Sequence, residues 1–98
     1  MRTTYTLDTP TPSELLHAGT YTAKGHRAWK PSKARAKAMR AHLLDRDGHT
    51  CGSCGYRSTS GLHLELDHII PYKSGGFFVE SNLQVLCQPC NVNKGADL

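Results

Sequence analysis

Apolar residues recur at helical spacing between residues 32 and 46, a segment that holds no glycine or proline and is rich in alanine. Ala36, Met39 and Leu43 fall at positions i, i+3 and i+7, so they share one face of a helix. A second stripe of the same helix is basic and consists of Lys33, Lys37 and Arg40. The pattern predicts a helix that packs its apolar face on the domain and keeps its basic face outward.

In the segment from residue 62 to residue 67, apolar and polar residues alternate, with leucines at 62, 64 and 66. Such alternation predicts a half-buried strand and places Asp67 on the face opposite the leucines. Ile69 and Ile70 extend the predicted strand as far as Pro71.

Shorter elements complete the chain. Residues 74–76 read as a glycine-containing loop, residues 82–86 as a second strand, and residues 88–94 as a final helix that ends before Gly95. The order of strand, loop, strand and helix predicts a small α+β fold with a basic helix in front of it.

The first 23 residues contain seven threonines and two prolines and show little hydrophobic periodicity, which predicts an irregular N-terminal arm. Within this arm, Thr11-Pro12-Ser13-Glu14 matches a capping box with proline at the first helical position, so one short helix is expected there. No internal repeat or heptad is visible. We therefore divide the chain into an arm, 1–23, and one compact domain, 24–98.

Positive charge is concentrated in residues 24–46, which hold eight of the twelve lysines and arginines but only one acid, Asp45. A cationic block of this kind attracts polyanions, and nucleic acid is the usual one, although a solvated basic helix without a partner has the same composition. No apolar run approaches the length of a signal-peptide core or a membrane span. We expect a soluble, cytoplasmic protein of a bacterium or a phage-infected cell, with no membrane partner.

The four cysteines form two C-x2-C pairs, Cys51 with Cys54 and Cys87 with Cys90. Paired knuckles of this kind suit tetrahedral zinc, whereas disulfides are the alternative and are disfavoured in a reducing compartment. Four thiolates leave no open position for water, so this zinc is predicted to be structural. A chain of 98 residues buries a small core, and a metal that binds only the folded state would stabilise it.

A second group of motifs surrounds these cysteines: Leu66-Asp67-His68-Ile69-Ile70-Pro71, then Gly75-Gly76, then Asn82-Leu83-Gln84-Val85-Leu86-Cys87, and finally Cys90-Asn91-Val92-Asn93-Lys94-Gly95. In their order and spacing, over residues 46–95, they resemble the HNH endonuclease family, including its small phage and bacterial members. The resemblance implies a ββα-metal (His-Me finger) fold stapled by a structural zinc with four cysteine ligands. It also implies hydrolysis of DNA phosphodiester bonds.

The resemblance also implies roles for individual residues. Asp67 and Asn91 would ligate one catalytic divalent cation, His68 would be the general base, and Asn82 would hold the hairpin loop and orient His68. Asn91 stands where the name-giving pattern has histidine, which corresponds to the HNN variation of the family. Because an amide oxygen is a harder ligand than an imidazole, we expect Mg²⁺ or Mn²⁺ at this site.

Each of these residues also has an ordinary structural explanation. Asp67 could form a turn, His68 could be a buried, hydrogen-bonded histidine, and either asparagine could cap a helix or turn. Contacts with the backbone of double-stranded DNA are predicted, against simple solvation, for Lys33, Lys37, Arg40, Lys73 and Lys94.

Two other functions remain open from the sequence. A zinc module that binds DNA or protein without catalysis needs only the cysteines and the basic helix, and it has no use for the Asp67-His68 pair. A nuclease active only within a larger assembly, such as a phage terminase, or as a homodimer is also compatible with the short chain. No base-reading domain is recognisable, so weak sequence preference is expected.

Overall fold

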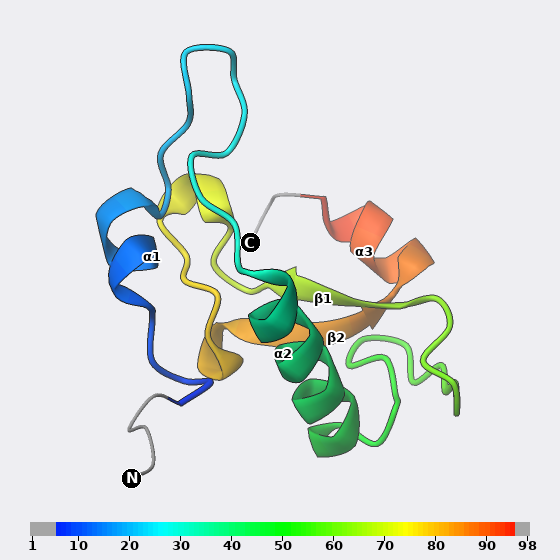
Figure 1. Ribbon diagram of the computed structural model, residues 1–98. Coiled ribbons are helices and arrows are strands. Elements are labelled where there is room, and N and C mark those ends of the chain that lie inside the picture. The colour runs from blue at the N-terminus through cyan, green and yellow to red at the C-terminus, as the bar shows by residue number, and fades with distance from the viewer. Residues whose placement is uncertain (1–5, 96–98) are drawn as a thin grey trace, which may run out of the picture.

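The computed structural model describes residues 6–95. The elements follow the order α1 (Pro12–His17), α2 (Lys33–Arg46), β1 (Leu64–His68), β2 (Leu83–Cys87) and α3 (Gln88–Lys94), with two short 3-10 helices, η1 (Tyr72–Ser74) and η2 (Glu80–Asn82), between the strands. The two strands form an antiparallel hairpin, and α3 follows it directly (Figure 1). The predicted small α+β fold, with its ββα unit, is confirmed. Within the described residues, no helix has the length and apolar character needed to cross a membrane.

The core lies between α2 and one face of the hairpin. Met39 and Leu43 of α2 are fully buried and belong to one apolar cluster with Leu64 and Val85 of the two strands. Ser32 caps the helix by accepting a hydrogen bond from the Arg35 N–H at 3.1 Å. The helix predicted over 32–46 is therefore confirmed, and its apolar stripe is buried as expected.

The first strand is shorter at both ends than the alternation predicted. It begins at Leu64, because His63 adopts a left-handed backbone with φ of 68° and Leu62 turns outward, 63% exposed. It ends at His68, and the predicted extension through residues 69–70 is wrong. The main-chain N–H of Ile70 bonds to the side chain of Asn82 instead of to a partner strand.

Strand register decides which polar groups meet. Asp67 pairs with Gln84, and Glu65 pairs with Leu86, so the side chains of these four residues share one face of the sheet. Helix α3 packs across the two strands on this face, as its contacts with Glu65 and Asp67 show. The hairpin therefore has an apolar face toward α2 and a largely polar face toward α3.

The N-terminal segment is packed against the rest of the molecule. Helix α1 forms where the capping box predicted it, and the Thr11 hydroxyl accepts the Glu14 N–H at 3.0 Å. The side chain of Glu14 is buried and accepts a hydrogen bond from the Phe78 N–H. Burial raises the pKa of Glu14, while the Phe78 bond and the charge of Arg35 act in the opposite direction.

Candidate functional site

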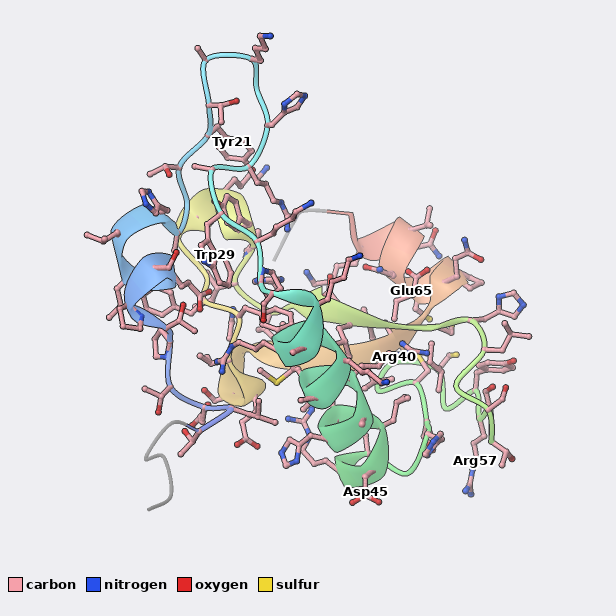
Figure 2. The ribbon with its side chains drawn as sticks, viewed as in Figure 1. Tyr21, Trp29, Arg40, Asp45, Arg57 and Glu65 are labelled. Carbon is pink, nitrogen blue, oxygen red and sulfur yellow. The ribbon has the colours of Figure 1, made fainter. Side chains whose placement is uncertain are left out.

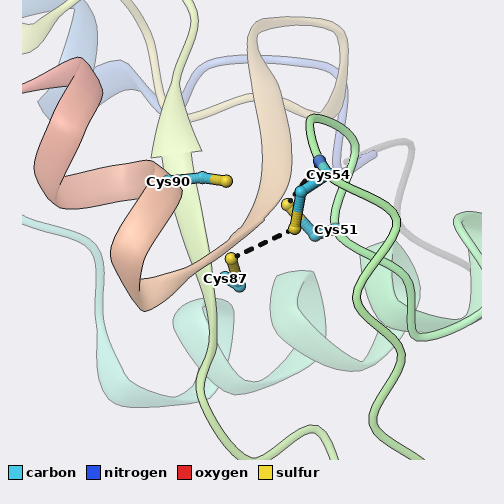
Figure 3. A group of neighbouring side chains, drawn as sticks. All are labelled: Cys51, Cys54, Cys87 and Cys90. Atoms are coloured by element: carbon cyan, nitrogen blue, oxygen red, sulfur yellow. Dashed lines mark hydrogen bonds between the residues drawn. The ribbon is translucent and has the colours of Figure 1, made fainter.

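Two elements far apart in the sequence bring the four cysteines together. Cys51 and Cys54 lie in the turn after α2, Cys87 ends β2, and Cys90 lies in the first turn of α3 (Figure 3). Their sulfur atoms all lie within 4.8 Å of one another, and those of Cys54 and Cys87 are 3.6 Å apart. Zinc with four sulfur ligands at about 2.3 Å requires sulfurs about 3.8 Å apart. The cluster therefore fits a metal ion such as zinc.

Hydrogen bonds within the cluster favour the ionised form of one thiol. Burial opposes the ionisation of Cys51, but the main-chain N–H groups of Cys54, Cys87 and Ser53 stabilise its thiolate and lower its pKa to about 6. For Cys87, a main-chain bond from Cys90 favours the thiolate, but burial and the neighbouring thiols prevail and raise the pKa to about 12. A bound divalent cation would allow all four groups to ionise together, because it supplies the missing positive charge.

A pocket of about 580 Å³ lies beside this cluster, lined by Cys54, Tyr56, His63, Cys87, Gln88, Pro89 and Cys90. Neither Asp67 nor His68 lines it. The pocket belongs to the surroundings of the cysteines and is not a cleft over the predicted catalytic residues.

The predicted cation ligands lie on the two sides of the contact between α3 and the polar face of the hairpin. Asp67 is buried, with 9% of its surface exposed, and its Oδ2 accepts a hydrogen bond from Gln84 Nε2 at 2.9 Å. The same oxygen forms an ion pair with Lys94 Nζ at 3.1 Å. Asn91 lies on α3 and donates its Nδ2 to Glu65 Oε1 at 2.7 Å. Two carboxylates, two amides and an ammonium group therefore form one polar layer.

His68 is the last residue of β1, and strand alternation assigns its side chain to the face opposite that of Asp67. Its ring packs near that of Phe78, with ring centroids 6.0 Å apart, and among the described residues its Nε2 is buried without a hydrogen-bond partner. Burial lowers the pKa of His68, and the positive charges of Arg27 and Lys94 act in the same direction, whereas Asp67 opposes them. These effects together favour the neutral form of the imidazole.

Asn82 holds the loop that follows His68. Its Oδ1 accepts the Ile70 N–H at 2.9 Å, and its Nδ2 donates to the carbonyls of Ile70, at 3.2 Å, and Phe77, at 3.0 Å. Gly76 completes the loop, because a Cβ at this position would meet the Ile70 carbonyl oxygen at 1.8 Å. The asparagine side chain thus ties both ends of the 70–77 loop together.

The five predicted DNA-contacting residues have different surroundings. Lys33 and Lys37 of α2 and Lys73 of η1 are exposed, whereas Lys94 is half-buried in its ion pair with Asp67. Arg40 reaches from α2 to the segment that leads into β1, where its guanidinium donates to the carbonyls of Leu64, at 2.7 Å, and Gly61, at 2.8 Å (Figure 2). Arg40 therefore ties α2 to this segment.

Sequence reasoning did not select three residues that the structure places at the site. Glu65 shares its strand face with Asp67, so the period of two alone could have indicated it. That Gln84 lies beside Asp67 could be predicted only from the register of the hairpin. Arg27 lies outside the motifs altogether, in the segment before α2, and nothing in the sequence pattern places its charge near His68.

Comparison with protein families finds one similarity, in the second half of the chain. The family model described as HNH endonuclease matches residues 51–97, which include all four cysteines and all four predicted catalytic and cation-binding residues. Searches among curated proteins and solved structures gave no match. The cysteine cluster and the ββα hairpin are consistent with the family match. Residues 51–97 are therefore similar to the HNH endonuclease family.

Proposed function

We propose that this protein is a metal-dependent DNA endonuclease in which His68 is the general base and Asp67 and Asn91 hold one divalent cation. The family match supports a nuclease. The observation that carries the residue assignment is the buried Nε2 of His68, which has no hydrogen-bond partner among the described residues, at the end of the strand that carries Asp67.

The environment of His68 suits proton abstraction from water. A general base must be unprotonated at the working pH, and burial together with two nearby positive charges lowers the pKa of His68. The loop tied by Asn82 follows the imidazole directly, so its backbone is held in one position. A water molecule between the imidazole and a phosphodiester would thus lose its proton to a fixed acceptor.

The residues of the polar layer fit a hard cation. An ionised carboxylate accepts hydrogen bonds and cannot donate them, so the bond between Asn91 and Glu65 requires the amide nitrogen to face Glu65. This orientation leaves Asn91 Oδ1 for a cation, on the helix whose Lys94 contacts the carboxylate of Asp67. Oxygen ligands of this type suit Mg²⁺ or Mn²⁺. When bound, such a cation would polarise the phosphate and stabilise the leaving oxygen.

The cysteine cluster would have a separate, structural role as a zinc site. It closes the chain around Asp67, His68 and Asn82, because its two halves lie on either side of them in the sequence. Exposed Lys33, Lys37 and Lys73 would contact the DNA backbone, which makes binding dependent on salt.

Cleavage of supercoiled plasmid by the zinc-loaded protein tests the proposal, with Mg²⁺ or Mn²⁺ added. His68→Ala should lower the rate by about 10²- to 10⁴-fold, the usual contribution of a general base. The matched control is His63→Asn, since His63 is exposed and asparagine tolerates its left-handed backbone. If wild type cuts no DNA, or if His68→Ala cuts as fast as the control, the proposed function is wrong.

A further inference from the structure

Residues 20–28 form a narrow hairpin loop, closed by one isolated β-bridge and called the ribbon below, that stands out from the body of the molecule (Figure 1). Tyr21 and Arg27 pair across it, the Thr22 N–H donates to the His26 carbonyl at 2.7 Å, and the Ala28 N–H donates to the Thr20 carbonyl at 3.0 Å. Every residue from 20 to 28 is exposed. At the tip, a Cβ built on Gly25 would meet no atom within 4 Å.

The base of this ribbon is held by Tyr72, which is buried. The Tyr72 hydroxyl accepts the Trp29 N–H at 3.1 Å and donates to the Thr20 carbonyl at 2.9 Å. The ring of Tyr21 packs edge-on against that of Tyr72 at 5.5 Å, and the guanidinium of Arg27 lies over the Tyr72 ring at 4.7 Å. The ribbon therefore has a defined direction relative to the domain.

Tyr72 also places the ribbon next to the proposed catalytic residues. It begins η1, four residues after His68, and Arg27 on the ribbon is one of the charges that act on the His68 ring. Anything that binds along the ribbon is thus brought close to His68.

The charge of the ribbon is entirely positive. Lys24 lies near its tip and Arg27 at its base, and Lys30 follows it, whereas the sequence contains no acid between residues 15 and 44. The ribbon buries no apolar core, and Tyr21 is its only large hydrophobic side chain. This chemistry complements a phosphate-lined groove better than an apolar protein surface.

We propose that the ribbon, residues 20–28, enters the major groove of duplex DNA beside the phosphodiester that is cut. The major groove of B-form DNA is about 12 Å wide and admits a two-stranded β-ribbon, whereas the major groove of A-form RNA is too narrow for side chains to read. The ribbon would select B-form duplexes and set the direction in which the DNA crosses His68. This inference rests on the proposed nuclease function.

The test is a variant that lacks the tip of the ribbon and keeps the part of the ribbon that contacts Tyr72. Replacing residues 22–26 by Asn-Gly leaves Tyr21 and Arg27 joined by a two-residue turn that suits a hairpin. The control is Arg57→Gln, an exposed arginine that Figure 2 shows far from the ribbon. All proteins carry His68→Ala to prevent cleavage, and zinc content and thermal unfolding establish that each variant is folded.

Binding is measured by fluorescence anisotropy against a DNA duplex and an RNA duplex of the same sequence, over a range of salt concentrations. The shortened ribbon should weaken DNA binding and lower the slope of log K against log salt by about 1, for the phosphate contact of Lys24. Binding to RNA should not change. Dimethyl sulfate footprinting should show protection of guanine N7, a major-groove atom, by the intact ribbon only.

Two results would overturn the inference. One is unchanged DNA affinity and footprint in the shortened variant; the other is an equal loss of binding to DNA and RNA, which would show a general charge effect. Plasmid cleavage by the protein with its native His68 distinguishes the two proposals. If the protein with native His68 cuts the plasmid and the shortened variant binds DNA normally, the ribbon inference alone fails. If the protein with native His68 neither cuts nor binds DNA, the nuclease proposal fails as well.

Discussion

Replacing Asn82 with aspartate tests how the 70–77 loop is held. The two side chains have the same shape, but aspartate can keep only one of the three hydrogen bonds, the one that its oxygen accepts from the Ile70 N–H. The other carboxylate oxygen would face the carbonyls of Ile70 and Phe77, to which the amide donates in the native protein. The variant therefore loses two bonds and gains two repulsive contacts.

The expected loss of stability follows from these contacts. A neutral hydrogen bond contributes about 1 kcal/mol net, so Asn82→Ala, which loses all three, should lower the free energy of unfolding by about 3 kcal/mol. Asn82→Asp should lose at least as much although it retains one bond, because a carboxylate facing two carbonyls is repelled. In a domain of this size, about 3 kcal/mol corresponds to a fall in Tm of more than about 10 °C.

Urea unfolding of the zinc-loaded protein, followed by circular dichroism, measures the loss. Asn93→Asp is the matched control, since Asn93 is exposed on α3 and the same substitution there should change the free energy of unfolding by less than about 1 kcal/mol. Plasmid cleavage should fall in Asn82→Asp, because the backbone after His68 is released. An Asn82→Asp variant that is as stable as the control would refute the proposed role of the amide.

Four further predictions follow from the contacts described. Arg40→Leu should lower the free energy of unfolding by about 2–4 kcal/mol, because two charge-assisted bonds to main-chain carbonyls are lost; a change confined to DNA affinity would contradict this. In an NMR titration of the zinc-loaded protein without added Mg²⁺ or Mn²⁺, the ring of His68 should titrate below pH 6.5, and Arg27→Gln should raise its pKa. Because the folded state then binds fewer protons than the unfolded state, this group lowers stability as the pH falls below about 6.5. Glu65→Ala should weaken Mn²⁺ binding, measured by electron paramagnetic resonance, because the Asn91 amide loses the acceptor that orients it, and unchanged affinity would argue against that role. Removal of zinc by a chelator should abolish the cooperative unfolding transition, and a transition that persists would mean that the cysteines contribute little to folding.

Local signals in the sequence predicted the helices well. Ser32 and Thr11 are capping residues whose hydrogen bonds lie within three positions along the chain, and the apolar spacing of α2 needs no distant partner. The ends of β1 were not predictable in this way. They depend on the left-handed backbone of His63 and on the side chain of Asn82, which is twelve residues from its partner Ile70.

In the candidate site, too, the features set by short-range patterns were predictable, and those set by long-range contacts were not. The cysteine knuckles are short-range patterns, and the structure brings all four sulfurs together. By contrast, the two carbonyls that bind Arg40 lie more than twenty residues away, so the sequence showed only a basic residue on an exposed stripe. The bond between Glu65 and Asn91 likewise depends on how α3 lies across the sheet.

The position of the cysteine pairs has a consequence for the newly made chain. Cys51 and Cys54 precede Asp67, His68 and Asn82 in the sequence, whereas Cys87 and Cys90 follow them, and Asn91 is the next residue synthesised. A ribosome therefore completes every other proposed catalytic residue before the metal cluster can close and α3 can deliver Asn91 to the hairpin. During translation, the order of synthesis itself would delay assembly of the complete site until the last residues of α3 are made.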